Sequence, residues 1–282
     1  VVTPHFFPGG DIGRLAVCGT VNDVATSGAV PQYLSCGFVL EEGFPMEDLR
    51  RICASMAACA KEAGVRIVTG DTKVVNRGHG DGVYINTTGV GFLPEGRDLS
   101  GRNIRPGDAV IVSGTLGDHG ITIMSCRESL SFKAEIESDA APLNHLIAAV
   151  LEAAPHTRAF RDPTRGGLAS TLNEFASQAG VDITVEEAAI PVKPAVLGAC
   201  EMLGYDVYQV ANEGKMVCVV PADEAEAALE AMHENPYGKD AALVGEVTEA
   251  KPDRGPKVFL RTAFGSTRIL DMLVGEQLPR IC

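Results

Sequence analysis

The sequence lacks several features, and these absences narrow the class of protein. No apolar run reaches the length of a membrane-spanning helix, and no basic-then-apolar leader stands at the start. Basic residues number 24 against 37 acidic ones, and the net charge of −13 argues against a nucleic-acid partner. Neither a P-loop lysine motif nor a protein-kinase signature is present. We therefore expect a soluble globular protein with no nucleic acid and no membrane among its partners.

The eight cysteines show no CxxC spacing and no clustered histidines, which disfavours a zinc site or a disulfide framework. Several of them, such as Cys53 and Cys59, lie in apolar segments and are expected to be small core residues. A reduced, cytoplasmic setting follows from this usage.

The last cysteine differs from the others, because it ends the chain on a segment with little structural preference. The nine residues from Val274 to Cys282 include Pro279, which has no backbone donor, and they span roughly 30 Å if extended. A thiol on such a tether can reach more than one site. The alternative interpretation is a cysteine without a role at an exposed terminus.

Two domains are expected from the length and from one polar stretch. A chain of 282 residues can bury two substantial cores. Turn-forming residues gather between Pro94 and Asp108, and this stretch is the predicted boundary. We therefore predict a first domain over residues 1–105, a second over residues 106–273 and a mobile tail over residues 274–282.

Helix and strand patterns alternate in both halves, which predicts mixed α/β domains. The predicted helices cover residues 47–63, 143–153, 167–179, 195–203 and 224–233, and Asn22–Asp23 is expected to open another helix. The predicted strands cover residues 66–69, 82–93, 109–112, 182–185, 216–220, 243–247 and 258–260.

Four acidic clusters each stand beside glycine, threonine or asparagine. They are Asn22-Asp23, Gly70-Asp71-Thr72-Lys73 after the strand at 66–69, Asp162-Pro163-Thr164-Arg165-Gly166-Gly167, and Asn212-Glu213-Gly214-Lys215. Each has a purely structural interpretation, with Asp23 and Asp162 as helix caps and the other two clusters as turns or a hairpin loop. Together they indicate a Mg²⁺–phosphate site, because Mg²⁺ takes one or two carboxylates plus phosphate oxygens. Two glycines before a helix would also let a phosphate approach backbone amides.

The order of the motifs and the residues within them resemble those of one known family. Phe6–Gly13, Gly19–Ala25, Gly70–Val75, Ser113–Gly120, Asp162–Gly167, Asn212–Lys215 and Pro279–Cys282 are together similar to the HypE family, the carbamoyl dehydratases of nickel–iron hydrogenase maturation. The resemblance runs along essentially the whole chain. Asn-Asp and Asp-Pro-Thr-Arg-Gly-Gly would indicate only the superfamily of aminoimidazole ribonucleotide synthetase and selenophosphate synthetase. Gly-Asp-Thr-Lys and the terminal Pro-Arg-Ile-Cys single out HypE.

One departure from the family concerns the start of the chain. Members begin with a further Gly-rich segment with acidic residues that help to bind ATP, and nothing in this sequence matches it. We therefore expect the chain to lack part of its nucleotide site.

The resemblance implies a fold and a set of partners. The fold would be α/β (α+β), with two mixed domains of the aminoimidazole ribonucleotide synthetase type. The first domain would form a homodimer through a shared β-barrel. ATP and Mg²⁺ would be the cofactors, and the carbamoyltransferase HypF and the HypC–HypD complex would be the protein partners.

The resemblance also implies roles for residues. Asp23, Asp71 and Asp162 would hold Mg²⁺. The ATP-binding residues would come from all four clusters: Asn22, Thr72, Lys73, Thr164, Gly166, Gly167 and Asn212. Cys282 would receive a carbamoyl group from HypF, and ATP would drive dehydration of this S-carboxamide to a thiocyanate, the source of the cyanide ligand of iron.

Two residues match the needs of that dehydration. Lys73 is the candidate cation for the γ-phosphate or the carboxamide oxygen, and Glu213 is the candidate base for the amide protons. His119, in the Gly117–Gly120 loop, is expected to have a structural role.

Two other functions are compatible with the residues. A non-catalytic thiol carrier or scaffold would use the tail and leave the acidic clusters structural. Another ATP-using member of the superfamily, such as thiamine-monophosphate kinase or selenophosphate synthetase, would leave the terminal cysteine unexplained. Binding of ATP and Mg²⁺ distinguishes a dehydratase from a carrier.

Overall fold

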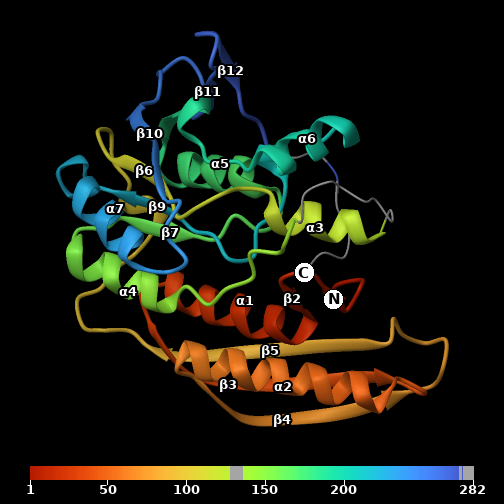
Figure 1. Cartoon of the computed structure of the whole chain (residues 1–282). Coiled ribbons are helices and arrows are strands. Elements are labelled where there is room, and N and C mark those ends of the chain that lie inside the picture. Colours follow the sequence, from red (N-terminus) through yellow and green to blue (C-terminus); the bar gives the residue numbers. More distant parts are fainter. Residues whose placement is uncertain (128–135, 273–274, 276–282) are drawn as a thin grey trace.

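The structure is a computed structural model that describes residues 1–127, 136–272 and 275. Cys282 and most of the predicted tail lie outside the described residues. Two sheets of unequal size are stacked with helices between them, and the smaller sheet forms the lower edge of the molecule in Figure 1. No helix in the described ranges is long and apolar enough to cross a membrane.

The smaller sheet has three strands in the order β4-β3-β5. β3 (Val30–Glu41) pairs in parallel with β4 (Arg66–Val75) and antiparallel with β5 (Val83–Phe92). α2 (Met46–Ala63) makes the crossover that a parallel pair requires. It ends at Gly64, whose φ of 71° lets its amide bond back to the last turn. The predicted helix in this region is confirmed.

One face of the smaller sheet is covered and the other is open. Leu34, Cys36 and Leu40 of β3 are buried in one core cluster with residues of the helices. Side chains alternate along a strand, so Gly37 and Val39 lie on the opposite face. Val39 is 36% exposed there. The molecule therefore presents an uncovered sheet face on the side away from its helices.

The chain enters this sheet through a short hairpin and a long helix. β1 (Phe6–Phe7) and β2 (Gly10–Asp11) pair antiparallel and lead into α1 (Ile12–Thr26). The carboxylate of Asp11 accepts the first free amides of the helix. The predicted helix start at Asn22–Asp23 is wrong, because this cap starts α1 about three turns earlier.

The larger sheet has seven strands in the order β12-β11-β8-β10-β6-β9-β7, and only the pair of β8 and β11 is parallel. The strands are β6 (Ala109–Val112), β7 (Ala159–Arg161), β8 (Val181–Glu186), β9 (Val217–Val220), β10 (Ala242–Glu249), β11 (Val258–Arg261) and β12 (Thr267–Ile269). In the central β6, Val110 and Val112 belong to one core cluster, and Ala109 and Ile111 to the other. A strand covered on both faces in this way reads as an uninterrupted apolar run.

Helices cover both faces of the larger sheet. α5 (Gly167–Ala179) and α6 (Pro194–Leu203) share one core cluster with the sheet, and α4 (Asn144–Ala153) and α7 (Ala225–Glu234) share the other. The remaining elements are α3 (Asp118–Arg127) and the short 3₁₀ helices η1 (Gly101–Asn103), η2 (Glu187–Ala189), η3 (Val207–Gln209) and η4 (Ala222–Glu224). The helices and strands predicted for this half are confirmed to within about two residues at each end.

Several local expectations are wrong. Gly70-Asp71-Thr72-Lys73 lies inside β4, because pairing with β3 continues to Val75. A side chain at Gly70 would overlap the carbonyl oxygen of Cys36, so glycine serves a close strand contact rather than a turn. The strand β3 was not predicted at all.

The other two clusters also differ from their structural interpretations. Asp162 does not cap a helix, since α5 begins only after Gly166. Asn212–Lys215 connects η3 to β9 and is not a hairpin loop.

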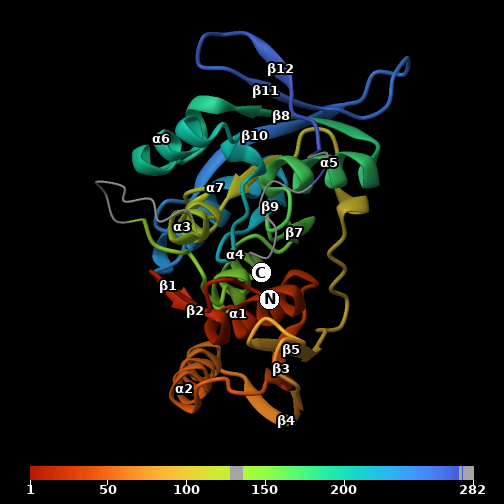
Figure 2. The ribbon, with the colours of Figure 1, turned by 90° about the vertical axis from the view of Figure 1, so that its right-hand side faces the viewer.

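α1 lies between the two sheets and contacts both halves of the molecule. It packs on β5 and α2 of the first half and on α4 and β7 of the second (Figure 2). Ile123, Ala140 and Ala211 of the second half enter the core cluster of the first. Residues on α1 are thereby held against loops from the far half of the chain.

Candidate functional site

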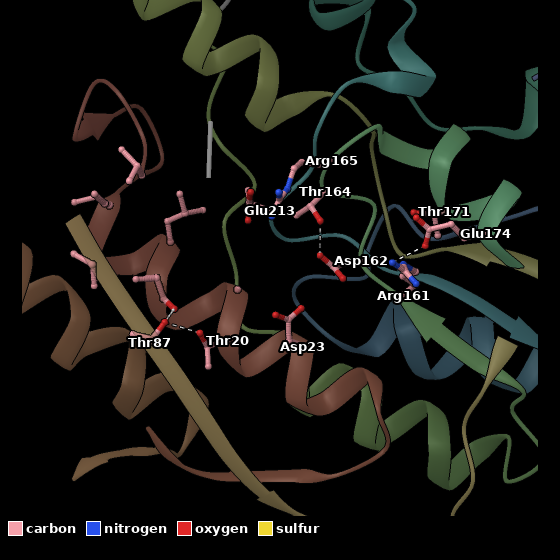
Figure 3. Close-up of a pocket in the computed structure, with 16 residues that line it drawn as sticks. Thr20, Asp23, Thr87, Arg161, Asp162, Thr164, Arg165, Thr171, Glu174 and Glu213 are labelled. Carbon is pink, nitrogen blue, oxygen red and sulfur yellow. Dashed lines mark hydrogen bonds and ion pairs between the residues drawn. The ribbon is translucent and has the colours of Figure 1, made fainter. Parts of the chain in front are cut away.

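A cavity of about 500 Å³ opens where α1, β5 and the loop between β7 and α5 meet. Its walls combine residues that are far apart in the sequence (Figure 3). Ala16, Thr20 and Asp23 come from α1, Thr87 from β5, and Asp162 from the end of β7. Three of the four acidic clusters therefore contribute to one cavity, through Asp23, the 162–165 loop and Glu213.

α1 supplies one wall because of its helical spacing. Ala16, Thr20 and Asp23 are three or four residues apart and so share one face of the helix. The Thr20 hydroxyl lies 2.5 Å from that of Thr87, which donates to the Ala16 carbonyl at 2.9 Å. This arrangement fixes β5 against the helix and sets the floor of the cavity.

Two carboxylates face the cavity from opposite sides. Asp162 accepts a hydrogen bond of 2.7 Å from the Thr164 hydroxyl, which orients it within its loop. Burial, and next the negative charge of Asp162, raise the pKa of Asp23, while Arg161 lowers it. A cation between the two carboxylates would remove this repulsion, and hard oxygen ligands of this kind suit Mg²⁺.

Glu213 is the most strongly perturbed acid of the cavity. It is 5% exposed, and its Oε1 atom has no hydrogen-bond partner in the described part of the chain. Burial raises its pKa well above the ordinary value, and the charges of Asp139, Asp162 and Asp23 raise it further. Arg165 opposes these effects. An unpaired buried carboxylate beside a cavity is a candidate proton acceptor.

Two arginines bring positive charge to the same walls. Arg161 pairs with Glu174 of α5 at 2.5 Å, and Arg165 follows Thr164 in the loop. Sequence reasoning assigned no role to Arg161, Glu174, Thr20 or Thr87. The helical spacing of Thr20 and Asp23 could have revealed Thr20, but nothing in the sequence joins its partner Thr87 to α1.

The two asparagines of the clusters bind the protein's own backbone. Asn22 donates to the Ala141 carbonyl at 3.0 Å and accepts the Leu143 amide at 2.7 Å. Asn212 donates to the carbonyls of Pro163 and Val210 and accepts the Gly117 amide. Both side chains are buried, and both join loops that border the cavity.

The backbone conformation explains why glycine occupies both positions before α5. Gly166 and Gly167 have φ of 73° and 57°, the left-handed region that favours glycine. A side chain at Gly167 would overlap the carbonyls of Tyr208 and Val210, and its amide donates to the Thr164 carbonyl at 3.1 Å. Neither glycine is among the residues that line the cavity.

The remaining cluster stands apart from the cavity. In β4, Asp71 and Lys73 pair with Gly37 and Val39 of β3, which lie on the open face of the sheet. Thr72 lies between them, and its amide bonds to the Asp71 carboxylate. All three are exposed, and none lines the cavity of Asp23 and Glu213. Within one copy, the structure does not bring Asp71, Thr72 and Lys73 to the other predicted site residues.

The sequence singled out two further residues, Cys282 and His119. Cys282 lies outside the described residues. His119 is fully buried, its Nδ1 lies 2.8 Å from the Ser138 hydroxyl, and its ring packs on Phe7. Across the described ranges, no three His, Cys, Asp or Glu side chains come together as a metal site. A metal held by Asp23 and Asp162 would therefore need ligands from the bound molecule, as Mg²⁺ with a nucleotide commonly does.

Family models match both halves of the chain. The model described as AIR synthase related protein, N-terminal domain, matches residues 1–93, and the corresponding C-terminal domain matches residues 105–255. The fold and the cavity between its halves thus define an AIR synthase-related protein of mixed α/β architecture.

Curated relatives narrow the assignment. The carbamoyl dehydratases HypE of Cupriavidus necator and Azotobacter vinelandii are 58% and 57% identical over 282 residues. The alignments cover all of this chain and 80% and 82% of those proteins. The chain belongs to the HypE family of carbamoyl dehydratases in hydrogenase maturation.

Solved structures agree with this assignment. A crystal structure of hydrogenase maturation protein HypE in complex with ATP has a TM-score of 0.94 and 52% identity, covering 100% of this chain and 84% of that one. A HypE–HypF complex has a TM-score of 0.92 and 52% identity, covering 96% of this chain and 88% of that one.

Proposed function

We propose that this chain dehydrates an S-carboxamide on Cys282 to a thiocyanate at the expense of ATP, and so provides the cyanide ligand of hydrogenase iron. One observation carries the proposal. The buried Glu213 carboxylate, unpaired at Oε1 among the described residues, borders a cavity with two more carboxylates, in a chain whose relatives are carbamoyl dehydratases. Removing protons from an amide nitrogen requires a base that is not neutralised by hydrogen bonds, and Glu213 meets this requirement.

ATP is the expected nucleotide, because a HypE relative is known in complex with it. The cavity has the volume of a small-molecule site, and Thr164 and Arg165 stand at its wall to meet phosphate oxygens. The remaining residues proposed for the ATP site do not line the cavity within one copy; they are Asn22, Thr72, Lys73, Gly166, Gly167 and Asn212. In this proposal Asn22 and Asn212 act mainly by holding the loops that form the walls.

Mg²⁺ fits the pair of Asp23 and Asp162, since a divalent cation would relieve the repulsion that raises the pKa of Asp23. When bound, it would neutralise phosphate charge during phosphoryl transfer to the carboxamide oxygen. Asp71 is the third proposed ligand. Its place on β4 requires that another copy or another conformation bring it to a cavity.

Lys73 also needs a second copy or another conformation to bring it to a cavity, and a homodimer would provide the second copy. We propose that a second copy covers the open face of the β4-β3-β5 sheet, so that the two sheets form a shared β-barrel. Val90 on β5 is 54% exposed there, and Val39 on β3 is 36% exposed. Lys73 would then supply the cation that stabilises the developing charge on the carboxamide oxygen.

The tail is the proposed carrier of the substrate. Residues 274–282 would bring Cys282 to the cavity for dehydration and move it out for loading and release. HypF, which is found in complex with a HypE relative, would load the carbamoyl group, and the HypC–HypD complex would receive the cyano group. The division into domains at 1–105 and 106–273 is part of this proposal.

The test is intact-mass analysis after incubation with HypF, carbamoyl phosphate and ATP. We expect a carbamoyl adduct on Cys282 that then loses one water, and no adduct on the Cys282→Ala variant. An adduct on Cys18 or Cys218 instead would refute the tail assignment. Loading without loss of water, with no affinity for ATP, would favour the thiol carrier.

A further inference from the structure

Asp139 contacts three consecutive residues of the loop that carries Glu213. Its Oδ1 atom accepts the amide of Glu213 at 3.1 Å, and its Oδ2 atom lies 3.5 Å from the ammonium of Lys215. Its carbonyl oxygen packs so closely on Gly214 that a Cβ there would overlap it. The Asp139 side chain is only 2% exposed and is not part of the cavity wall.

The segment that contains Asp139 is itself tied to α1. The Ala140 carbonyl accepts Arg14 Nε at 2.8 Å, and Asn22 holds Ala141 and Leu143 through both ends of its amide. Arg14 and Asn22 are residues of α1, and Asn22 immediately precedes Asp23. Residues 139–143 therefore bridge the helix that carries one cavity carboxylate and the loop that carries another.

This bridge has an energetic reason to exist. Glu213 is buried among carboxylates, and Oε1 gains no hydrogen bond in the described ranges. A charged loop side chain in such surroundings would otherwise turn toward water. Three contacts from one buried residue fix the backbone at 213–215, so the side chain keeps its direction into the cavity.

We propose that Asp139 is a positioning residue for dehydration: it holds the Glu213 loop at a fixed place relative to α1. Asp139 touches neither nucleotide nor carboxamide in this scheme, and it acts through Glu213. This inference rests on the proposed role of Glu213 as the base. A misplacement of a catalytic group by about 1 Å can reduce the rate about 100-fold.

The substitutions Asp139→Ala and Asp139→Asn separate positioning from charge. Alanine removes the acceptor for the Glu213 amide, whereas asparagine keeps an oxygen at Oδ1 and loses the charge and the Oδ2 acceptor that faces Lys215. We expect single-turnover conversion of carboxamide to thiocyanate to fall about 10- to 100-fold in Asp139→Ala and to recover most of this loss in Asp139→Asn. The KM for ATP should stay near the wild-type value in both.

Asp108→Ala is the matched control. Asp108 makes the same two kinds of contact, since its carboxylate accepts the Arg105 amide at 2.7 Å and pairs with Arg158 at 3.2 Å, and its side chain is 5% exposed. It does not line the cavity. The control should lose thermal stability to a similar extent and keep the wild-type rate. Equal losses of rate in Asp108→Ala and Asp139→Ala would overturn the inference, and so would a wild-type rate in Asp139→Ala.

A second readout does not depend on the reaction. Hydrogen exchange at the amides of 213–215 should accelerate in Asp139→Ala and stay slow in Asp139→Asn and Asp108→Ala. Unchanged protection in Asp139→Ala would disprove the role of Asp139 in fixing the Glu213 loop, even if the protein is an active dehydratase. A wild-type rate in Glu213→Gln together with the expected exchange pattern would instead refute Glu213 as the base, while Asp139 would still be shown to fix the 213–215 loop.

Discussion

The cavity at α1 and the open sheet face differ in how far a single chain completes them. Asp23, Asp162 and Glu213 converge on one cavity, although they lie on α1, after β7 and before β9. Asp71 and Lys73 are exposed on the uncovered face of β4. The same kind of motif, an acid beside a small polar residue, thus has a complete setting in one region and an incomplete one in the other. In the proposed function, the open face is therefore the region that a second copy of the chain would complete.

The strongest way to test the cavity is to remove its proposed base, Glu213. Glu213→Gln keeps the size of the side chain and cannot accept a proton, so dehydration should fall about 10²- to 10⁴-fold. Carbamoylated Cys282 should accumulate, as seen by intact mass, while ATP still binds. Thiocyanate formation at the normal rate would show that another group removes the amide protons.

Lys73→Ala tests the open face in the same assay. We expect a loss of about 10²-fold or more in dehydration, comparable to the removal of one charge-stabilising donor. Lys73 is exposed in β4, so the thermal midpoint should not change. If Lys73→Ala dehydrates normally, the open face has no part in the chemistry and the comparison between the two regions fails.

The proposed association of two copies can be tested without changing either set of polar residues. Val90→Asp places a charge on the exposed face of β5, where a second sheet would have to bury it. Sedimentation or light scattering should show a shift from dimer to monomer, with dehydration reduced along with it. The control is Leu197→Asp on α6, at a residue that is 45% exposed against 54% for Val90, and it should leave the molecular mass in solution unchanged.

The smallest expected effect concerns stability and pH in the absence of nucleotide and divalent cations. Burial, with Asp139, Asp162 and Asp23, raises the pKa of Glu213 above its ordinary value of 4.5, against the influence of Arg165. Because the folded state then binds its proton more tightly than the unfolded state, wild-type stability falls as the pH rises from about 4.5 toward the folded pKa. Glu213→Gln has no such loss.

The thermal midpoint of Glu213→Gln should therefore exceed that of the wild type by a few degrees at pH 7 to 8, and the difference should vanish near pH 4. Lys73→Ala should follow the wild-type curve at every pH. A difference between Glu213→Gln and the wild type that does not vary with pH would contradict the unfavourable burial of this carboxylate.

Local regularities made most of the fold predictable. α2 has apolar residues at helical spacing and a glycine at its end, and β6 is an apolar run between turns. Both are recognisable because neighbours in sequence decide them. β3 was not predicted because Pro31, Ser35 and Gly37 interrupt the alternation of apolar and polar residues. Its two partner strands stabilise it instead. The start of α1 was missed because Asp11 was not recognised as its cap.

The candidate site was predictable as a set of residues but not as an arrangement. The clusters around Asp23, Asp162 and Glu213 were visible as acids beside small polar residues, which is a property of the sequence. Their separation from Lys73 was not visible, because alternation in β4 and the register with β3 place Lys73 on the open face. The bridge from α1 to the Glu213 loop through Asp139 carries no motif of its own.

The sequence by itself determined the family, many of the helices and strands, and the chemical groups at hand, because these depend on residue identity and on neighbours a few positions apart. Only the tertiary structure decided which acids share a cavity, which face of β4 is open, and which buried residue fixes Glu213. Those outcomes depend on contacts between segments far apart in the sequence, as in the bond from Asn22 to Ala141, which spans 119 residues. Such contacts form only where whole elements pack together, so no local pattern can encode them.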